Sequence, residues 1–212
     1  MTDFARLRER MVAKQIVARG IDDPALLAAL RSVPREAFVA PALARAAYDD
    51  RALPIEADQT ISQPYIVALM IAAAELGPDD HVLEVGAGSG YAAAVLGQIV
   101  RDVIAIERHA TLAQLAAERM AQLGYPNVRI VEGDGTLGWP DAAPYDAILV
   151  AAGGGHVPRP LIEQLRPGGG LVMPIGGRWA GQTLMKFTRY EDGSLTRDAL
   201  CEVRFVPLVG AN

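Results

Sequence analysis

The run LEVGAGSGY at residues 83–91 constrains the fold of this chain more than any other segment. A short apolar stretch typical of a strand leads into three glycines at alternate positions, Gly86, Gly88 and Gly90, and an alanine-rich stretch typical of a helix follows. Glycines in such a turn let the backbone bend sharply and approach a ligand without interference from a Cβ atom. The run therefore predicts a strand, a nucleotide-binding turn and a helix in succession.

The spacing of these glycines discriminates between two classes of nucleotide cofactor. A dinucleotide-binding fingerprint would have its third glycine at position 91, which is Tyr91 in this chain. The observed spacing, with Glu84 two residues before the first glycine, is typical of loops that hold S-adenosylmethionine, which has no pyrophosphate to place on a helix N-terminus. A plain glycine turn between a strand and a helix stays open as the alternative for this run alone.

Apolar strands and helical stretches alternate from His81 onward. Such alternation predicts right-handed βαβ units and a doubly wound, mostly parallel α/β sheet of the Rossmann-like kind, with helices on both faces. Two later stretches, 182–190 and 200–208, flank the turn-forming sequence EDGS and predict an antiparallel pair at the edge of the sheet. The predicted parallel strands lie near residues 81–86, 102–107, 128–132, 146–152 and 170–175, and the predicted helices lie near 91–99, 110–123 and 158–165.

Residues 1–60 predict a helical extension ahead of this alternating core. A helix over 3–19 is expected to end at Gly20, and Asp23 before Pro24 provides an N-cap and first turn for a second helix. Several prolines break the remainder into short pieces. We expect a single domain over residues 1–212, with the extension at 1–60 and the cofactor-binding α/β core at 61–212.

Composition excludes several functional classes. The net charge of −5 disfavours a nucleic-acid partner, because phosphate binding requires clustered Lys and Arg. A lone cysteine, Cys201, and three histidines without metal-ligand spacing predict neither disulfides nor a metal site. We expect His81 and His109 at the surface beside strand ends. No apolar run approaches the ~20 residues of a membrane span, so a protein without a membrane partner, in the cytoplasm, is expected.

Candidate cofactor-binding residues follow the predicted strands, where a doubly wound sheet binds its ligands. Glu107 closes the strand VIAIE, 21 positions after Gly86, where a carboxylate can accept hydrogen bonds from both hydroxyls of an adenosine ribose. Asp134 follows the next strand and could accept from the adenine amino group, or it could be a turn aspartate between two glycines. Glu84 could order the glycine loop or meet the amino group of the cofactor.

Ser62, in the segment QTISQPY, stands just before a predicted helix that has Pro64 near its first position. Its hydroxyl could therefore cap backbone N–H groups, which is the structural alternative to a role in chemistry. The surrounding sequence suggests no histidine base, so a nucleophilic serine of the acyl-transfer kind is not supported.

The motifs together resemble those of a known family. Nearly the full chain is similar to protein-L-isoaspartate O-methyltransferases, through DRALPI, QTISQPYIVALM, LEVGAGSGYAAAVLG, IERH, GDGTLGWP, YDAILVAA and LRPGGGLVMPIG. QTISQPY is the specific string, since the glycine loop marks only the wider methyltransferase class. The resemblance implies a seven-stranded sheet with extra N-terminal helices, and methyl transfer from S-adenosylmethionine to the α-carboxylate of L-isoaspartyl residues in damaged proteins. This methylation starts repair to aspartate through a succinimide and releases S-adenosyl-L-homocysteine.

The resemblance also assigns residues to roles. Ser62 matches the active-site serine of the family, and a monomeric or weakly associating enzyme acting on isoaspartyl proteins and peptides is expected. The expected substrate-binding residues are Thr60, Ile61, Ser62 and Gln63. The expected cofactor-binding residues are Glu84, Gly86, Gly88, Ser89, Gly90, Glu107, Arg108, Asp134 and Gly135.

Two segments depart from the family pattern. Asp58 stands where the family usually has a glycine before QTIS, and its charge would repel an anionic substrate unless it points to solvent. Gly153, Gly154 and Gly155 replace the more usual alanine and proline residues and predict a looser loop. Two alternatives therefore stay open, which are a family member redirected to another carboxylate or small molecule, and a binding protein that holds the adenosyl group without catalysis.

Overall fold

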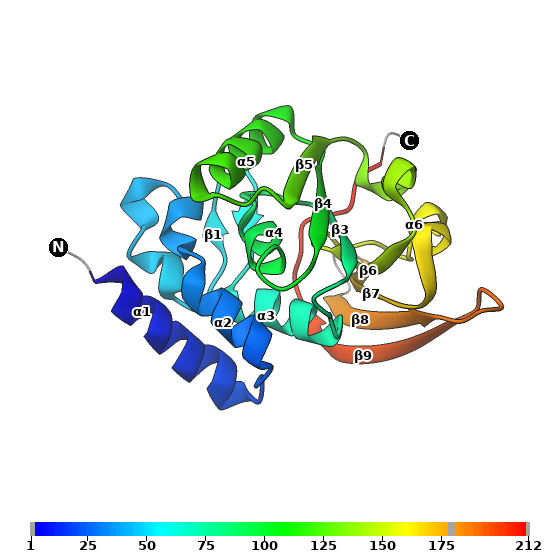
Figure 1. The fold of residues 1–212 in the computed structure, drawn as a ribbon, viewed down its shortest axis with the longest axis horizontal. Coiled ribbons are helices and arrows are strands. Elements are labelled where there is room, and N and C mark those ends of the chain that lie inside the picture. Colours follow the sequence, from blue (N-terminus) through cyan, green and yellow to red (C-terminus); the bar gives the residue numbers. More distant parts are fainter. Residues whose placement is uncertain (1–2, 178–180, 211–212) are drawn as a thin grey trace.

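A seven-stranded sheet forms the centre of the molecule, in the order β5-β4-β3-β6-β7-β8-β9 (Figure 1). The computed structural model describes residues 3–177 and 181–210, so the ends of the predicted domain 1–212 lie outside the described residues. Strands β5 to β7 in this order are parallel, and β8 and β9 are antiparallel, which confirms the predicted sheet. The strands are β3 (His81–Val85), β4 (Asp102–Glu107), β5 (Val128–Glu132), β6 (Tyr145–Val150), β7 (Leu165–Gly177), β8 (Gly181–Arg189) and β9 (Leu195–Val203).

Helices cover both faces of the sheet, and successive residues of strand β3 point to opposite faces. Val82 belongs to the apolar cluster under the N-terminal helices, whereas Leu83 belongs to the cluster that contains Leu161 of α6. Both strand residues are fully buried. The helices are α1 (Phe4–Met11), α2 (Pro24–Ser32), α3 (Pro64–Ala73), α4 (Tyr91–Leu96), α5 (Ala110–Leu123) and α6 (Arg159–Gln164).

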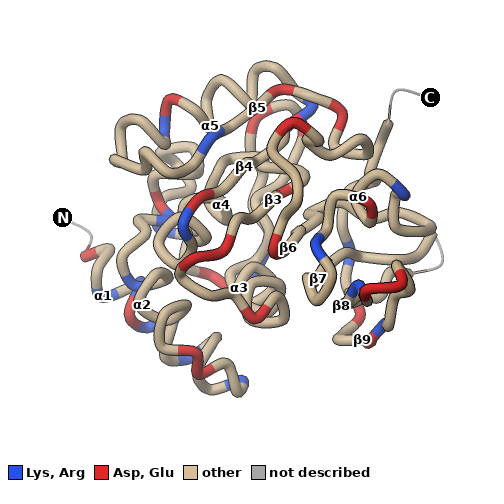
Figure 2. The backbone as a smooth tube through the Cα atoms, turned by 45° about the vertical axis from the view of Figure 1, so that its right-hand side comes forward, with Lys and Arg blue, Asp and Glu red and all other residues tan. Residues whose placement is uncertain are grey.

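The N-terminal extension is helical, as predicted. Helix α1 continues through a π-helical turn and a 3-10 turn to Gly20, whose φ of 88° allows the chain to reverse. Helix α2 begins as expected, with the Asp23 carboxylate accepting from the Leu26 N–H at 2.7 Å and with Pro24 in the first turn. Figure 2 shows acidic and basic residues interspersed along α1, α2 and the β8–β9 pair.

The extension also contains an element that the sequence did not predict. Strands β1 (Leu53–Pro54) and β2 (Thr60–Ile61) pair as a small antiparallel hairpin. Ala57 and Asp58 at its tip have φ values of 56° and 55°, in the left-handed region that normally selects glycine or asparagine. These two residues therefore gave no hairpin signal in the sequence. The left-handed backbone at position 58 explains why a glycine would suit it.

Two local predictions need correction. The second edge strand runs over Leu195–Val203 instead of 200–208. Beyond Val203 a side chain replaces the backbone partner, since the Oε1 of Gln182 accepts from the Phe205 N–H at 2.7 Å. His81 is only 8% exposed and lies within the structure, with its Nδ1 2.5 Å from the Asp102 carboxylate and its ring stacked on Tyr145. His81 is the first residue of β3, which has β4 on one side and β6 on the other.

Replacement of Asp58 by glycine should stabilise the protein. A glycine has no Cβ penalty at a φ of 55°, so we expect Asp58→Gly to raise the free energy of unfolding by about 0.5 to 1 kcal/mol. Asp58→Ala should lower this free energy, because alanine tolerates left-handed backbone less well than aspartate. Urea denaturation of the two variants and the parent measures both effects, and a glycine variant less stable than the alanine variant would contradict the strained turn.

Candidate active site

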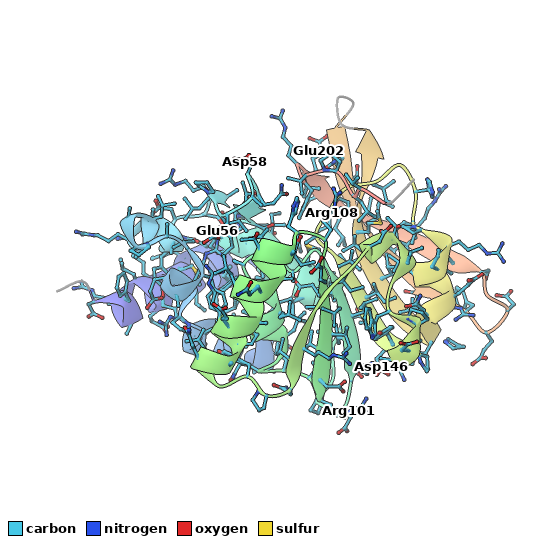
Figure 3. All side chains as sticks on the ribbon, turned by 90° about the horizontal axis from the view of Figure 1, so that it is seen from above. Glu56, Asp58, Arg101, Arg108, Asp146 and Glu202 are labelled. Carbon is cyan, nitrogen blue, oxygen red and sulfur yellow. The ribbon has the colours of Figure 1, made fainter. Side chains whose placement is uncertain are left out.

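The candidate site lies at the carboxyl ends of the parallel strands, where strand order reverses. Strand β3 has β4 on one side and β6 on the other, and parallel sheets bind their ligands at such a point. A pocket of about 400 Å³ opens there. Figure 3 shows Asp58 and Arg108, which line this pocket, in the upper half of the view, with Arg101 and Asp146 on the lower side.

The glycine loop forms one wall of this pocket through its backbone. Gly86 and Gly90 have φ values of 90° and 89°, which other residues rarely adopt. The Gly86 and Ala87 N–H groups donate to the Ile106 carbonyl, which ties the loop to the end of β4. A Cβ on Gly90 would lie 3.1 Å from the Met120 side chain and 3.3 Å from the Ala116 Cβ, so α5 packs closely against this glycine at the start of α4. The loop is therefore a fixed surface against which a ligand can rest.

Glu107 joins the end of β4 to this loop. Its Oε2 accepts from the Gly88 N–H at 2.9 Å, and its Oε1 accepts from the His109 N–H at 2.9 Å. The side chain is 5% exposed and lines the pocket. Carboxylate oxygens can each accept more than one hydrogen bond, so this geometry leaves acceptor capacity for two ligand hydroxyls. Arg108, the next residue, is exposed and also lines the pocket.

Glu84 places a second carboxyl group on the floor of the same pocket. The residue is 2% exposed, and its Oε2 has no hydrogen-bond partner within the described part of the chain. Burial, and secondarily the charge of Glu107, raises the pKa of Glu84 from 4.5 to about 8. An acceptor buried without a partner is costly, so the arrangement fits a ligand that carries a hydrogen-bonding cation.

The turn after β5 closes another side of the pocket. Gly135 lines it and packs so tightly that a Cβ would lie 2.3 Å from Val85. Asp134 is not among the lining residues, and its Oδ1 accepts from the Thr136 N–H at 2.9 Å and from the Thr136 hydroxyl at 2.7 Å. The structure thus places Asp134 at the start of a 3-10 turn, Gly135–Leu137, beside the site.

Ser62 stands between this pocket and a larger cleft. The cleft, about 1010 Å³, shares four lining residues with the pocket, namely Thr60, Ser62, Ala151 and Val206. Helix α3 begins after Gln63, which makes no side-chain cap, and the Ser62 hydroxyl makes no hydrogen bond among the described residues. The capping role considered for this serine is therefore not observed. Of its neighbours, Ile61 lines the pocket and Gln63 lines the cleft.

A C-terminal segment that sequence reasoning missed also lines the site. Val206–Val209 border the pocket, and the Gly153 backbone holds them by two hydrogen bonds of 2.8 Å, to the Val206 carbonyl and from the Leu208 N–H. A Cβ on Gly153 would lie 2.2 Å from the Gln182 side chain. The expected looser loop at 153–155 is therefore wrong, since its first glycine is buried and paired. No local pattern indicates this pairing, because its two segments lie far apart in sequence.

Neither a metal centre nor a membrane helix is found in the described ranges 3–177 and 181–210. No group of three or more His, Cys, Asp or Glu side chains there is arranged to hold a metal ion. No helix in those ranges is both long and apolar enough to cross a membrane.

Comparisons with known proteins agree with this geometry. The sequence profile of the Protein-L-isoaspartate(D-aspartate) O-methyltransferase (PCMT) family matches residues 6–212. The chain belongs to this family. It is 55% identical to the Protein-L-isoaspartate O-methyltransferase 2 of Pelobacter propionicus, over 96% of this chain and 91% of that one. It is 56% identical to a Protein-L-isoaspartate O-methyltransferase of Rhodopseudomonas palustris, over 95% and 92%.

Solved structures of similar proteins show the same fold. A protein-L-isoaspartate O-methyltransferase structure matches with a TM-score of 0.86 and 30% identity, over 96% of this chain and 66% of that one. A Plasmodium falciparum protein, solved in complex with S-adenosyl-L-homocysteine, matches with a TM-score of 0.82 and 24% identity over 99% of both chains. The predictions of the family and of its seven-stranded methyltransferase fold are confirmed.

The buried Glu84 carboxyl should make the ligand-free protein less stable as pH rises. Its folded pKa of about 8 lies above its ordinary value of 4.5, so between these values the folded protein keeps a proton that the unfolded chain has lost. Stability should therefore fall from pH 5 to pH 8, and Glu84→Gln should reduce this fall.

The control is Glu132→Gln, which changes an exposed glutamate at the end of β5. Thermal unfolding of the parent and both variants, followed across this pH range, gives the slope of stability against pH for each protein. The same slope in all three proteins would show that Glu84 is ionised in the folded state.

Proposed function

We propose that this chain transfers a methyl group from S-adenosylmethionine to the α-carboxylate of L-isoaspartyl residues, with Ser62 orienting that carboxylate. The observation that carries the proposal is the position of Ser62, which borders both the glycine-walled pocket and the larger cleft. Family membership supports the reaction, and the two adjoining cavities supply one space for an adenosyl group and another for a peptide. Methylation of the carboxylate would start its repair to aspartate through a succinimide.

The residues of the pocket fit an adenosyl cofactor. Glu107 would accept from the ribose hydroxyls, and the backbone of Gly86, Gly88 and Ser89, which line the pocket, would lie against the ligand. Gly90 is not a lining residue and would support the loop by packing on α5. Glu84 would pair with the cationic amino group, which gives its unpartnered oxygen a hydrogen bond. Arg108, Asp134 and Gly135 would border the nucleoside end. When bound, the cofactor supplies a methyl group made electrophilic by its sulfonium.

The substrate needs orientation more than activation. A carboxylate with an ordinary pKa of about 3.5 to 4 is already ionised at neutral pH, so it requires no general base. Ser62 would donate a hydrogen bond that fixes one carboxylate oxygen, while Thr60 and Gln63 line the cleft and Ile61 lines the pocket. Holding the reacting atoms in line can contribute about 7 to 11 kcal/mol. Asp58 is exposed at the hairpin tip, where water screens its charge from an anionic substrate.

We also propose that residues 1–212 act as one domain, as a monomer in the cytoplasm, on isoaspartyl proteins and peptides. One apolar cluster runs from Leu26 of α2 and Val67 of α3 to Val82 of the sheet, which supports a single folding unit. Light scattering at working concentration tests the monomer, and a dimer mass would contradict it.

Removal of the Ser62 hydroxyl should abolish most turnover without loss of the cofactor. We expect Ser62→Ala to lower the methylation rate of an L-isoaspartyl peptide about 100-fold, the usual cost of losing one orienting donor, with S-adenosylhomocysteine affinity unchanged. The assay measures base-labile methyl ester from labelled S-adenosylmethionine, and a matched peptide with normal aspartate should stay unlabelled. Unchanged turnover in Ser62→Ala would remove Ser62 from the mechanism. Labelling of neither peptide by the parent would contradict the proposed reaction.

Narrowing the pocket should weaken cofactor binding. Gly135→Ala places a Cβ 2.3 Å from Val85, and relief of such overpacking would shift the pocket wall, so we expect at least about tenfold weaker binding of S-adenosylhomocysteine. Gly155→Ala is the matched control, because a Cβ there meets nothing within 4 Å. Isothermal titration calorimetry measures the dissociation constant of S-adenosylhomocysteine for both variants. Equal affinity in the two variants would argue against an adenosyl group beside Gly135.

A further inference from the structure

Arg35 is a charged side chain in the interior, in the 3-10 helix Arg35–Phe38 of the N-terminal extension. Its relative exposure is 0%, and it ranks first by size among the fully buried side chains of the described residues. Burial lowers the pKa of Arg35, yet a guanidinium stays protonated in proteins. A cation in such a place needs compensation from its surroundings.

The polar groups around Arg35 are two carbonyl oxygens and the Tyr91 hydroxyl, whose interaction with the guanidinium raises the pKa of Arg35. Its Nε donates to the Ala47 carbonyl at 2.7 Å, and its Nη2 donates to the Ser62 carbonyl at 2.7 Å. Asp50, whose charge raises the pKa of Arg35, is already bound by Arg19 at 2.8 Å and by the Tyr65 N–H at 3.1 Å. Nη1 of Arg35 is buried without a hydrogen bond of normal geometry among the described residues. The compensation of the buried charge of Arg35 is therefore incomplete.

An aromatic contact connects Arg35 to Tyr91, at the start of α4. The guanidinium carbon lies 4.6 Å from the centre of the Tyr91 ring, and Tyr91 is the first residue of α4, directly after Gly90. Tyr91 also lines the cofactor pocket. Arg35 therefore touches both the peptide group of Ser62 and the helix that follows the glycine loop. The contact and the hydrogen bond together set the position of the serine relative to the cofactor pocket.

An apolar side chain of similar length would fill this position without leaving a buried charge. Replacement of incompletely paired buried ions by apolar residues is often neutral or stabilising. Stability alone therefore gives no reason for an arginine at position 35. The geometry gives a different reason, since a planar guanidinium can donate to two carbonyls and pack on a ring at once.

We propose that Arg35 is a positioning residue for methyl transfer, which fixes the Ser62 peptide group against the first turn of α4. This inference rests on the proposed role of Ser62. Arg35 lines neither the pocket nor the cleft, and it acts by holding the hydroxyl of Ser62 at the junction of the two. Misplacement of such a group by about 1 Å can cost roughly 100-fold in rate.

The first test is a double-mutant cycle of Arg35→Met and Ser62→Ala. We expect Arg35→Met alone to lower kcat for the isoaspartyl peptide about 10- to 100-fold, with the S-adenosylhomocysteine dissociation constant changed less than about threefold. In the Ser62→Ala background, the same change should cost less than about twofold, because the hydroxyl that it misplaces is gone. Equal losses in both backgrounds, or full activity in Arg35→Met, would overturn the proposal.

Two further variants separate positioning from general damage. Arg189→Met is the matched control, since Arg189 also donates to backbone carbonyls, those of Glu163 and Leu165, and lines neither the pocket nor the cleft. It should keep kcat. Arg35→Lys keeps the charge but cannot reach both carbonyls with a rigid fork, so we expect kcat between those of Arg35→Met and the parent. Parent kcat in Arg35→Lys would show that the guanidinium geometry is not needed.

Hydrogen exchange tests the positioning without turnover. Amides of residues 60–66 should exchange faster in Arg35→Met and Arg35→Lys, while those of α5 should not change. Unchanged exchange at 60–66 would overturn the inference even if the parent methylates no isoaspartyl peptide. Faster exchange at residues 60–66 in both variants, together with a parent that methylates no isoaspartyl peptide, would instead contradict only the proposed reaction. Urea midpoints of all variants confirm that each is folded under the assay conditions.

Discussion

The hydrogen bond from the Gly88 N–H to the Glu107 carboxylate joins the two strands on which the site depends. It ties the glycine loop after β3 to the end of β4, at the place where the order of the sheet reverses. Because both partners are largely buried, the charge-assisted bond is stronger than a bond in water. The same carboxylate is then presented to the pocket, so one interaction both closes the loop and prepares an acceptor for a ribose.

Two buried ionisable groups near Ser62, Glu84 and Arg35, show where this fold departs from maximum stability. Glu84 raises the free energy of the empty pocket because its carboxyl is desolvated beside Glu107. Arg35 places a cation beside the Ser62 carbonyl, with carbonyl and aromatic partners. Groups of this kind are concentrated at functional sites, where they bind or orient ligands.

The sequence predicted the sheet and the cofactor wall well, because those features have local signatures. Alternating apolar strands indicated β3 to β7, and the glycine spacing with Glu107 indicated the pocket. The hairpin tip at Ala57 and Asp58 was missed because it lacks the usual turn residues. The pairing of Gly153 with Val206–Val209 and the burial of Arg35 arise only from tertiary packing, so no local pattern could reveal them.

A crystal structure of the protein with S-adenosylhomocysteine and an L-isoaspartyl peptide tests the central claim most directly. The ribose hydroxyls should lie on Glu107, and one oxygen of the isoaspartyl α-carboxylate should accept a hydrogen bond from the Ser62 hydroxyl while the other faces the sulfur. Both ligands should occupy the adjoining cavities that share Thr60 and Ser62. An isoaspartyl carboxylate bound away from Ser62, or an adenosyl group in the larger cleft, would contradict the proposed arrangement.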